Sequence, residues 1–271
     1  MRHLFLIILL SLSTPSLAVP RVLASIAPVY EIAAAIMQGV GEPRLLIDGN
    51  QSAHHFSFKP SHLRLVQQAQ LLIWVDRNFE EGLQRIPEMI PPGYRHIELL
   101  RQIGIDSSDG HFWYSSELLQ RSIERITEAL QEIDKDNAQA YRRNADRLIN
   151  ELKTWHVQLP ANRQNPFLVT DHEFLGHFET YSGIGVLASI YNHFDDHAGI
   201  KNLNELESKL QQYRPRCLLS LDRAVSKLAN NLAEKYQLEI IYLSSADNNH
   251  GDSPAIIQRL QRLSDAIKRC R

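Results

Sequence analysis

The sequence predicts an α/β protein of two lobes, each a mostly parallel sheet flanked by helices, joined by a long backbone helix. Three observations predict this class. Short apolar segments alternate with amphipathic helical segments in the first third of the chain. A long helical pattern without strand segments follows. The alternation then resumes to the end of the chain, and such alternation is typical of parallel sheets covered by helices.

Residues 1–18 have the composition of a cleaved export signal. The start is short and basic, Leu4–Leu12 is almost wholly apolar, and Ser16-Leu17-Ala18 supplies the small residues that a signal peptidase recognises. The apolar run is shorter than the roughly 20 residues of a membrane-spanning helix. We therefore expect cleavage after Ala18 and a mature protein outside the cytoplasm, with a short membrane anchor or a buried strand as the alternatives.

Residues 19–136 are assigned to the N-terminal lobe. Its first apolar run is followed by Pro28, which is well placed in the first turn of a helix that extends to Met37. Strand and helix segments then alternate as far as Val75. The predicted elements here are strands at 22–26, 45–47 and 71–75 and helices at 28–37 and 60–69.

The middle of the chain predicts two amphipathic helices. Apolar residues recur at steps of three and four from Leu119 to Ile133, and again from Tyr141 to Trp155. A polar break at 134–137 separates the two patterns, and Pro160 ends the second. We expect residues 137–159 to form a rigid helix of roughly 30 Å that connects the lobes. An ordinary helical hairpin packed on the sheet is the alternative.

Residues 160–271 are assigned to the C-terminal lobe, where the alternation resumes. Ligands of such sheets bind beyond the carboxyl ends of the strands, often between two domains. Functional side chains are therefore expected in the loops that follow strands. The predicted elements are strands at 167–170, 217–221 and 238–243 and helices at 203–213, 224–236 and 254–268.

Composition excludes some functions and predicts a disulfide. The chain is 44% hydrophobic and 22% charged, with a formal net charge of −2. It therefore carries no electrostatic footprint for nucleic acid or an anionic membrane. The two cysteines, Cys217 and Cys270, are too far apart for a CxxC redox motif. In an exported protein such a pair is more often a disulfide than a metal site or a nucleophile.

Three of the twelve histidines stand at the expected position of a cleft. His54 lies in the loop after the second predicted strand, His111 precedes the first long helix, and His172 follows the strand at 167–170. Neutral imidazole suits Zn²⁺, and three such ligands leave one position for water or a carboxylate. No short motif links the three, so position alone also allows each to be a surface or hydrogen-bonded histidine.

The segment His172–His177 raises an enzymatic alternative. It resembles the HELLGH segment of the dipeptidyl peptidase III family in five of six letters. Zinc-protease helices use histidines four residues apart, whereas a spacing of five places them about 140° apart around a helix. The chain has no second acidic motif and is far shorter than those enzymes. We expect no enzyme, and keep as an alternative a zinc-dependent hydrolase in which three histidines hold the metal and Glu173 is the base.

Four segments together resemble one known family. Ala24-Ser25-Ile26-Ala27-Pro28-Val29-Tyr30 is similar to its opening strand and helix. His54-His55-Phe56-Ser57-Phe58-Lys59-Pro60-Ser61 resembles its first ligand segment, His-x-Tyr-x-x-x-Pro-Ser. His111-Phe112-Trp113 resembles the second, His-x-Trp, and His172-Glu173-Phe174-Leu175-Gly176-His177-Phe178 the third, His-Asp-Ala-Phe-Gly-Tyr-Phe. In order and separation they resemble the zinc-uptake branch of the metal-specific solute-binding proteins of ABC transporters.

The resemblance implies two α/β lobes on a long helix, with Zn²⁺ held by His54, His111 and His172. It implies a monomeric periplasmic receptor that binds zinc with high affinity and delivers it to an ABC-type zinc permease in the inner membrane. Cys217 and Cys270 fall where some zinc-uptake members place a disulfide. A periplasmic zinc chaperone or an adhesin on the same fold is the alternative.

The sequence departs from the family pattern at one ligand position. Ser244 stands where manganese and iron binders use the Asp of a Leu-Asp-Pro-Leu-Gly segment as fourth ligand. Losing that carboxylate favours nitrogen-rich coordination, and hence Zn²⁺ over Mn²⁺. The fourth position is left to water, His55, Glu173 or Asp247. The histidine-rich acidic loop of many zinc members is also absent, which is compatible with a divergent paralogue or an auxiliary receptor.

Overall fold

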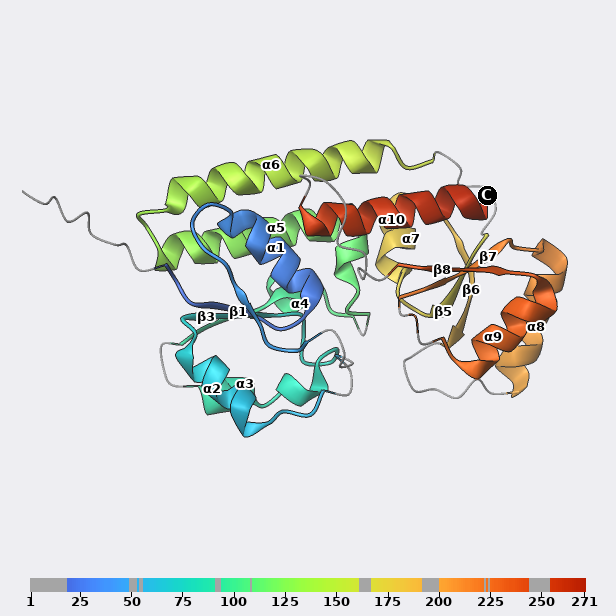
Figure 1. Cartoon of the computed structure of the whole chain (residues 1–271), viewed down its shortest axis with the longest axis horizontal. Coiled ribbons are helices and arrows are strands. Elements are labelled where there is room, and N and C mark those ends of the chain that lie inside the picture. The colour runs from blue at the N-terminus through green and yellow to red at the C-terminus, as the bar shows by residue number, and fades with distance from the viewer. Residues whose placement is uncertain are drawn as a thin grey trace, which may run out of the picture.

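The two lobes predicted above are present in the structure. This computed structural model describes residues 19–48, 53, 56–90, 94–107, 109–160, 167–191, 200–221, 223, 225–243 and 254–271. Two parallel four-stranded sheets, ordered β2-β1-β3-β4 and β6-β5-β7-β8, form separate lobes (Figure 1), which confirms the predicted fold class. Among the residues described, no helix has the length and apolar character needed to cross a membrane.

The N-terminal sheet is buried at its centre. Every residue of β1 and β3 is buried, as expected for continuous apolar strands covered on both faces. Pro28 occupies the first turn of α1, as predicted. The elements of this lobe are β1 (Val22–Ala24), α1 (Ala27–Met37), β2 (Arg44–Leu45), α2 (Pro60–Gln68), β3 (Leu71–Trp74), α3 (Ile86–Met89), β4 (Arg95–Glu98) and α4 (Leu99–Gln102).

The C-terminal sheet has β5 and β7 at its centre. Strand β5 continues to His172, so this histidine ends the strand instead of following it. Neither β6 nor β4 of the other lobe is among the strands predicted above. The elements are β5 (Leu168–His172), α7 (Gly176–Ser182), β6 (Val186–Tyr191), α8 (Ile200–Tyr213), β7 (Cys217–Ser220), α9 (Lys227–Tyr236), β8 (Glu239–Tyr242) and α10 (Ala255–Cys270).

The two predicted amphipathic helices are α5 (Ser116–Ile133) and α6 (Ala138–Val157). The side chain of Ser115 caps α5 by accepting a hydrogen bond from the backbone of Leu118. Helix α6 packs on α5, and the Asn144 amide donates to the carbonyls of Ile36 and Gln38 at the end of α1. Helix α6 is thus both one arm of a hairpin and a support for the N-terminal lobe.

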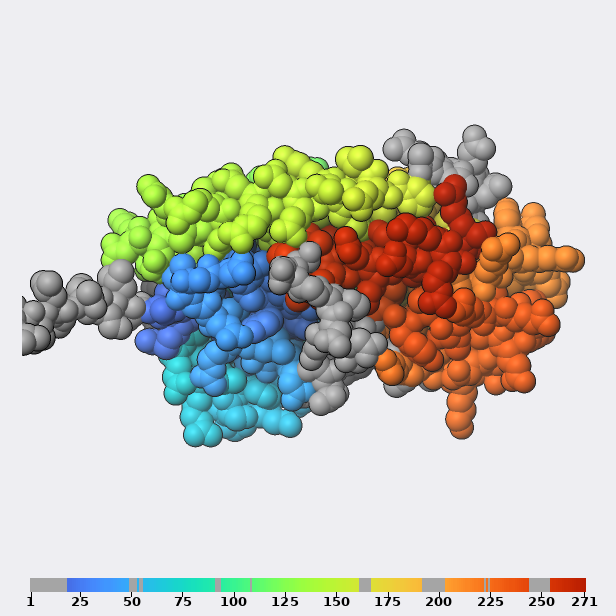
Figure 2. Space-filling model, turned by 45° about the horizontal axis from the view of Figure 1, so that its top comes forward, coloured from blue at the N-terminus to red at the C-terminus, as the bar shows by residue number. Residues whose placement is uncertain are grey.

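Helix α10 contacts both lobes, although its residues lie in the segment assigned above to the C-terminal lobe. Figure 2 shows it running alongside α6, from the N-terminal segments at one end to the C-terminal lobe at the other. The Arg259 guanidinium donates to both carboxylate oxygens of Glu31 in α1, at 3.0 and 2.5 Å. Each of these two residues is 7% exposed, and removing one charge of such a pair typically costs about 3–5 kcal/mol. Trp155 of α6 also donates to Leu260 and Ser264.

The other end of α10 is covalently joined to the C-terminal sheet. Cys270 forms a disulfide with Cys217 of β7, with Cα atoms 5.4 Å apart, as predicted. We expect replacement of both cysteines by alanine to lower the free energy of unfolding by about 4 kcal/mol, because the bridge restricts the unfolded chain across a separation of 53 residues. Urea unfolding measures this loss, and the reduced wild-type protein is the matched control. Equal stability of the oxidised and reduced proteins would contradict the prediction.

Candidate metal centre

Two of the three predicted zinc ligands, one from each lobe, meet in the structure. His111 lies in the loop before the short 3₁₀ helix Phe112–Tyr114, and His172 is the last residue of β5. Their ring centroids are 5.5 Å apart, and the residues are 3% and 6% exposed. The third predicted ligand, His54, lies outside the described residues. So do the export signal 1–18, Ser244, and the alternative ligands His55 and Asp247.

Asp109 orients the His111 ring. One carboxylate oxygen of Asp109 accepts from the backbone N–H of His111 at 2.9 Å and lies 2.8 Å from its Nδ1. Because an ionised carboxylate only accepts, Nδ1 carries the proton and neutral His111 offers Nε2 to a metal. Burial lowers the pKa of His111, and Asp109 opposes that shift only in part. His111 is therefore neutral at neutral pH, the state that coordinates metal.

Asp171 makes the same arrangement with His172. Its Oδ1 lies 2.8 Å from Nδ1 of His172, which again leaves Nε2 as the metal-binding nitrogen. The other oxygen of Asp171 accepts a hydrogen bond from the hydroxyl of Ser220 on the neighbouring strand β7. Each candidate ligand is thus oriented by its own carboxylate, and the carboxylate of His172 is fixed by the sheet.

Aromatic rings pack around the two histidines. The His111 ring lies 5.1 Å from the rings of Phe79 and Trp113, and Phe174 lies 6.2 Å from His111 and 5.1 Å from His172. All three aromatic residues are buried. Such an apolar surrounding limits solvent access and sets the local dielectric around a metal. The pair of imidazoles therefore sits in a buried and largely apolar environment.

The donor types fit zinc, but the described residues supply only part of a site. Imidazole nitrogens suit Zn²⁺, as they also suit copper, iron and nickel, and they do not suit Mg²⁺ or Ca²⁺. Within the described part of the chain, no group of three or more His, Cys, Asp or Glu side chains is placed to hold a metal. Glu173, a predicted alternative ligand, is exposed beside His172 and lines a hollow of about 220 Å³.

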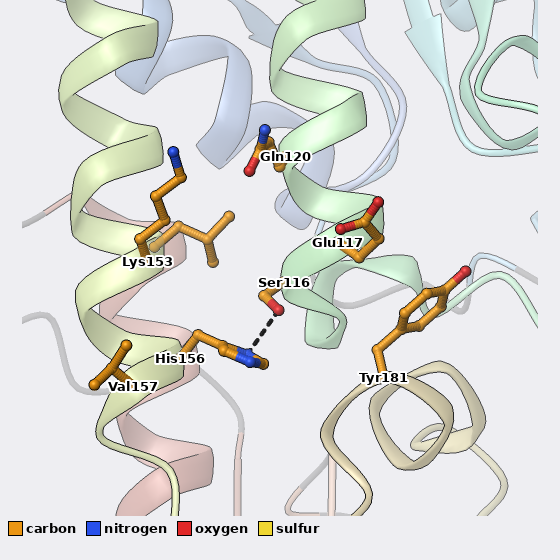
Figure 3. Close-up of a pocket in the computed structure, with 8 residues that line it drawn as sticks. Ser116, Glu117, Gln120, Lys153, His156, Val157 and Tyr181 are labelled. Atoms are coloured by element: carbon orange, nitrogen blue, oxygen red, sulfur yellow. Dashed lines mark hydrogen bonds between the residues drawn. The ribbon is translucent and has the colours of Figure 1, made fainter.

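Other histidines have roles away from this pair. Nδ1 of His62 accepts from the backbone of Lys59 at the start of α2, and His96 lies in β4. His156 of α6 is 2.8 Å from the hydroxyl of Ser116, facing it across the pocket of Figure 3. That pocket, of about 450 Å³, is lined by neither His111 nor His172.

His177 is not placed for the protease-like arrangement considered above. His172 ends β5 whereas His177 lies in α7, so the two do not share a helix. Nε2 of His177 lies 2.8 Å from the backbone carbonyl of Asp109. The roles of Asp109, Asp171 and His177 are not predicted from the sequence above. The available signal for the two carboxylates is their position, two residues before His111 and directly before His172.

A family model matches almost the whole chain. The model of the family described as "Zinc-uptake complex component A periplasmic" (ZnuA) matches residues 22–270. The high-affinity zinc uptake system protein ZnuA of Haemophilus ducreyi is 26% identical over 300 residues, covering 96% of each chain. The protein of the same name from Bacillus subtilis is 20% identical over 280 residues, covering 91% of this chain and 87% of that one.

Solved structures show the same fold. The Zn(II)-bound ZnuA-like domain of Streptococcus pneumoniae AdcA is similar with a TM-score of 0.75 and 18% identity, covering 93% of this chain and 99% of that one. A periplasmic metal binding protein from Candidatus Liberibacter asiaticus is similar with the same TM-score, identity and coverage. At these identities the likeness establishes the arrangement of the two lobes.

Proposed function

The chain belongs to the family of periplasmic zinc-uptake complex component A proteins, and from that premise we propose that it binds Zn²⁺ in the periplasm and delivers it to an ABC importer. Two observations carry the proposal. The family match spans both lobes, and a buried imidazole from each lobe meets the other between them. Because the family is a component of zinc uptake, we propose a binding protein and no enzyme.

The proposed ligands are His54, His111 and His172. On a tetrahedral zinc with Zn–N distances of about 2.05 Å, two imidazole ring centres lie about 5.2 Å apart. The ring centroids of His111 and His172 are 5.5 Å apart, which supports their sharing one metal ion. His54 would supply the third nitrogen from the loop that precedes α2. The fourth position is proposed for water, His55, Glu173 or Asp247.

We propose that the metal ties the two lobes together. In this proposal residues 19–136 form the N-terminal lobe, 137–159 the connecting helix and 160–271 the C-terminal lobe. His54 and His111 precede the connecting helix and His172 follows it, so one ion bound to all three joins both sides. The contact of α10 with Glu31 through Arg259 adds a second connection, which involves no metal ligand.

The cellular setting follows from the same family. We propose that residues 1–18 are a signal peptide that is removed on export, that the mature protein is a monomer, and that its partner is an ABC-type zinc permease of the inner membrane. The disulfide between Cys217 and Cys270 supports an oxidising compartment, since such bonds persist in the periplasm and are rare in the cytosol.

Metal content tests the proposal directly. Protein purified from the periplasm without added metal is expected to carry Zn²⁺ at up to one ion per chain, and to select zinc when dialysed against equal zinc and manganese. Nitrogen-rich ligation is the physical reason for that preference. Inductively coupled plasma mass spectrometry gives the stoichiometry. Selection of manganese, or no metal bound after dialysis, would contradict the proposed function.

A further inference from the structure

We propose that His177 is a positioning residue for zinc binding, which holds the segment 109–111 in place from the opposite lobe. The inference rests on the proposed role of His111 as a zinc ligand. Nε2 of His177 lies 2.8 Å from the carbonyl oxygen of Asp109. A carbonyl oxygen only accepts, so His177 donates this hydrogen bond. The side chain of His177 is 13% exposed, which largely shields the bond from water.

Asp109 transmits this contact to the candidate ligand. Its carboxylate receives both the backbone N–H and Nδ1 of His111, while its carbonyl receives His177. One residue thus joins the zinc-binding ring of the N-terminal lobe to helix α7 of the C-terminal lobe. His177 does not touch the metal in this arrangement and acts only through Asp109.

The segment has little room to move. A Cβ atom on Gly110 would lie 2.0 Å from the ring of Phe79, so the backbone at Gly110 packs directly on that ring. On the other side, a Cβ atom on Gly176 would lie 3.0 Å from a carboxylate oxygen of Asp109. Segment 109–111 is therefore packed against both Phe79 and the beginning of α7. The His177 hydrogen bond fixes the position of this segment relative to α7.

The His177 hydrogen bond also starts from the segment that bears the other candidate ligand, His172. His172 and His177 lie at the two ends of a short stretch that includes Phe174 and Leu175, both buried. Because this stretch is packed in place, the bond from His177 to Asp109 sets the position of His111 relative to His172. Ligands held in their binding geometry lose less conformational freedom when the metal arrives, which strengthens binding.

Two amide variants test whether this hydrogen bond requires a donor at the distance of Nε2 from the backbone. In His177→Gln the amide N–H₂ extends far enough to donate to Asp109, whereas in His177→Asn it is one methylene shorter. Outer-shell partners of a metal ligand typically contribute about 10- to 100-fold in affinity. We expect His177→Asn to weaken zinc binding about tenfold at the lower end of that range, and His177→Gln to remain near wild type. Affinity is measured by competition with a fluorescent zinc chelator.

Two further measurements separate positioning from a general loss of structure. The visible absorption spectrum of the Co²⁺-substituted protein reports ligand geometry, and it should change in His177→Asn and not in His177→Gln. His156→Asn is the matched control, because His156 also makes a side-chain hydrogen bond but lies in the pocket of Figure 3. It should bind zinc as wild type does.

The outcomes distinguish this inference from the proposed function. Equal affinities of His177→Asn and wild type, or equal losses in the Asn and Gln variants, would overturn the role of His177. His111→Ala is measured in parallel. If it keeps wild-type affinity, the ligand assignment itself fails. If it loses affinity while His177→Asn does not, the ligand assignment stands and only the positioning role fails.

Discussion

Alanine in place of His111 or His172 is expected to weaken zinc binding at least about a hundredfold. Structural zinc sites bind with about 10–16 kcal/mol, so one of three or four ligands accounts for roughly 3 kcal/mol. Both rings are buried with Nδ1 on a carboxylate, so neither can be replaced by a neighbouring donor without rearranging Asp109 or Asp171. The same loss is expected for His54→Ala. Isothermal titration and chelator competition measure it.

Three histidines outside the centre provide the controls. His62→Ala, His96→Ala and His156→Ala are expected to bind zinc as wild type does. These residues lie in α2, β4 and α6, outside the elements that bear the two buried imidazoles. They test whether the loss is specific to the proposed ligands. Similar losses in all six variants would show that the ligand set is misassigned.

The zinc-dependent rise in melting temperature is expected to be large at pH 7.5 and small near pH 5. Zinc that binds only the folded protein stabilises it by about 4 kcal/mol at a thousandfold excess over Kd. Each imidazole must be neutral to coordinate, and an ordinary histidine has a pKa of about 6.5, so protons compete below about pH 6. A site dominated by carboxylates would keep most of its stabilisation at pH 5.

The metal-free protein is expected to lose stability over part of the same range. Burial lowers the pKa of His111 in the folded state below its value in the unfolded chain. As the pH falls below about 6.5, the unfolded chain takes up a proton at His111 that the folded chain resists, so acid favours unfolding. Melting curves with and without zinc at both pH values separate the two effects. A zinc increment that is unchanged across the range would show that histidines do not dominate the site.

The sequence by itself determined the class of fold and the order of most elements. Three local patterns predict these elements: the steps of three and four in α5 and α6, the apolar runs at β1, β3, β5 and β7, and Pro28 at the start of α1. Such patterns can be recognised in a sequence because backbone geometry fixes the direction in which successive side chains point. Strand β4 shows the limit of this reasoning. Its sequence, Arg95-His96-Ile97-Glu98, has no strand pattern, and it becomes a strand because it pairs with β3.

The burial of Glu98 is a second feature that the sequence does not predict, because a carboxylate is not expected to have a fully buried side chain. Its burial depends on Arg77 and Arg101, which lie on either side of it in the chain and both donate to it. Ion pairing of this kind is what permits a buried charge. The partners are recognisable only once the strand and its neighbouring loop are placed.

Tertiary structure alone brought the two candidate ligands together. The sequence and its family resemblance selected His111 and His172, but their separation of 5.5 Å and the bond from His177 to Asp109 arise where the lobes meet. Helix α10 shows the same physics, because Arg259 pairs with Glu31 across 228 residues of chain. Local periodicity governs which residues form most of the helices and strands, whereas contacts between distant segments depend on how those elements pack, and the approach of His111 to His172 is such a contact.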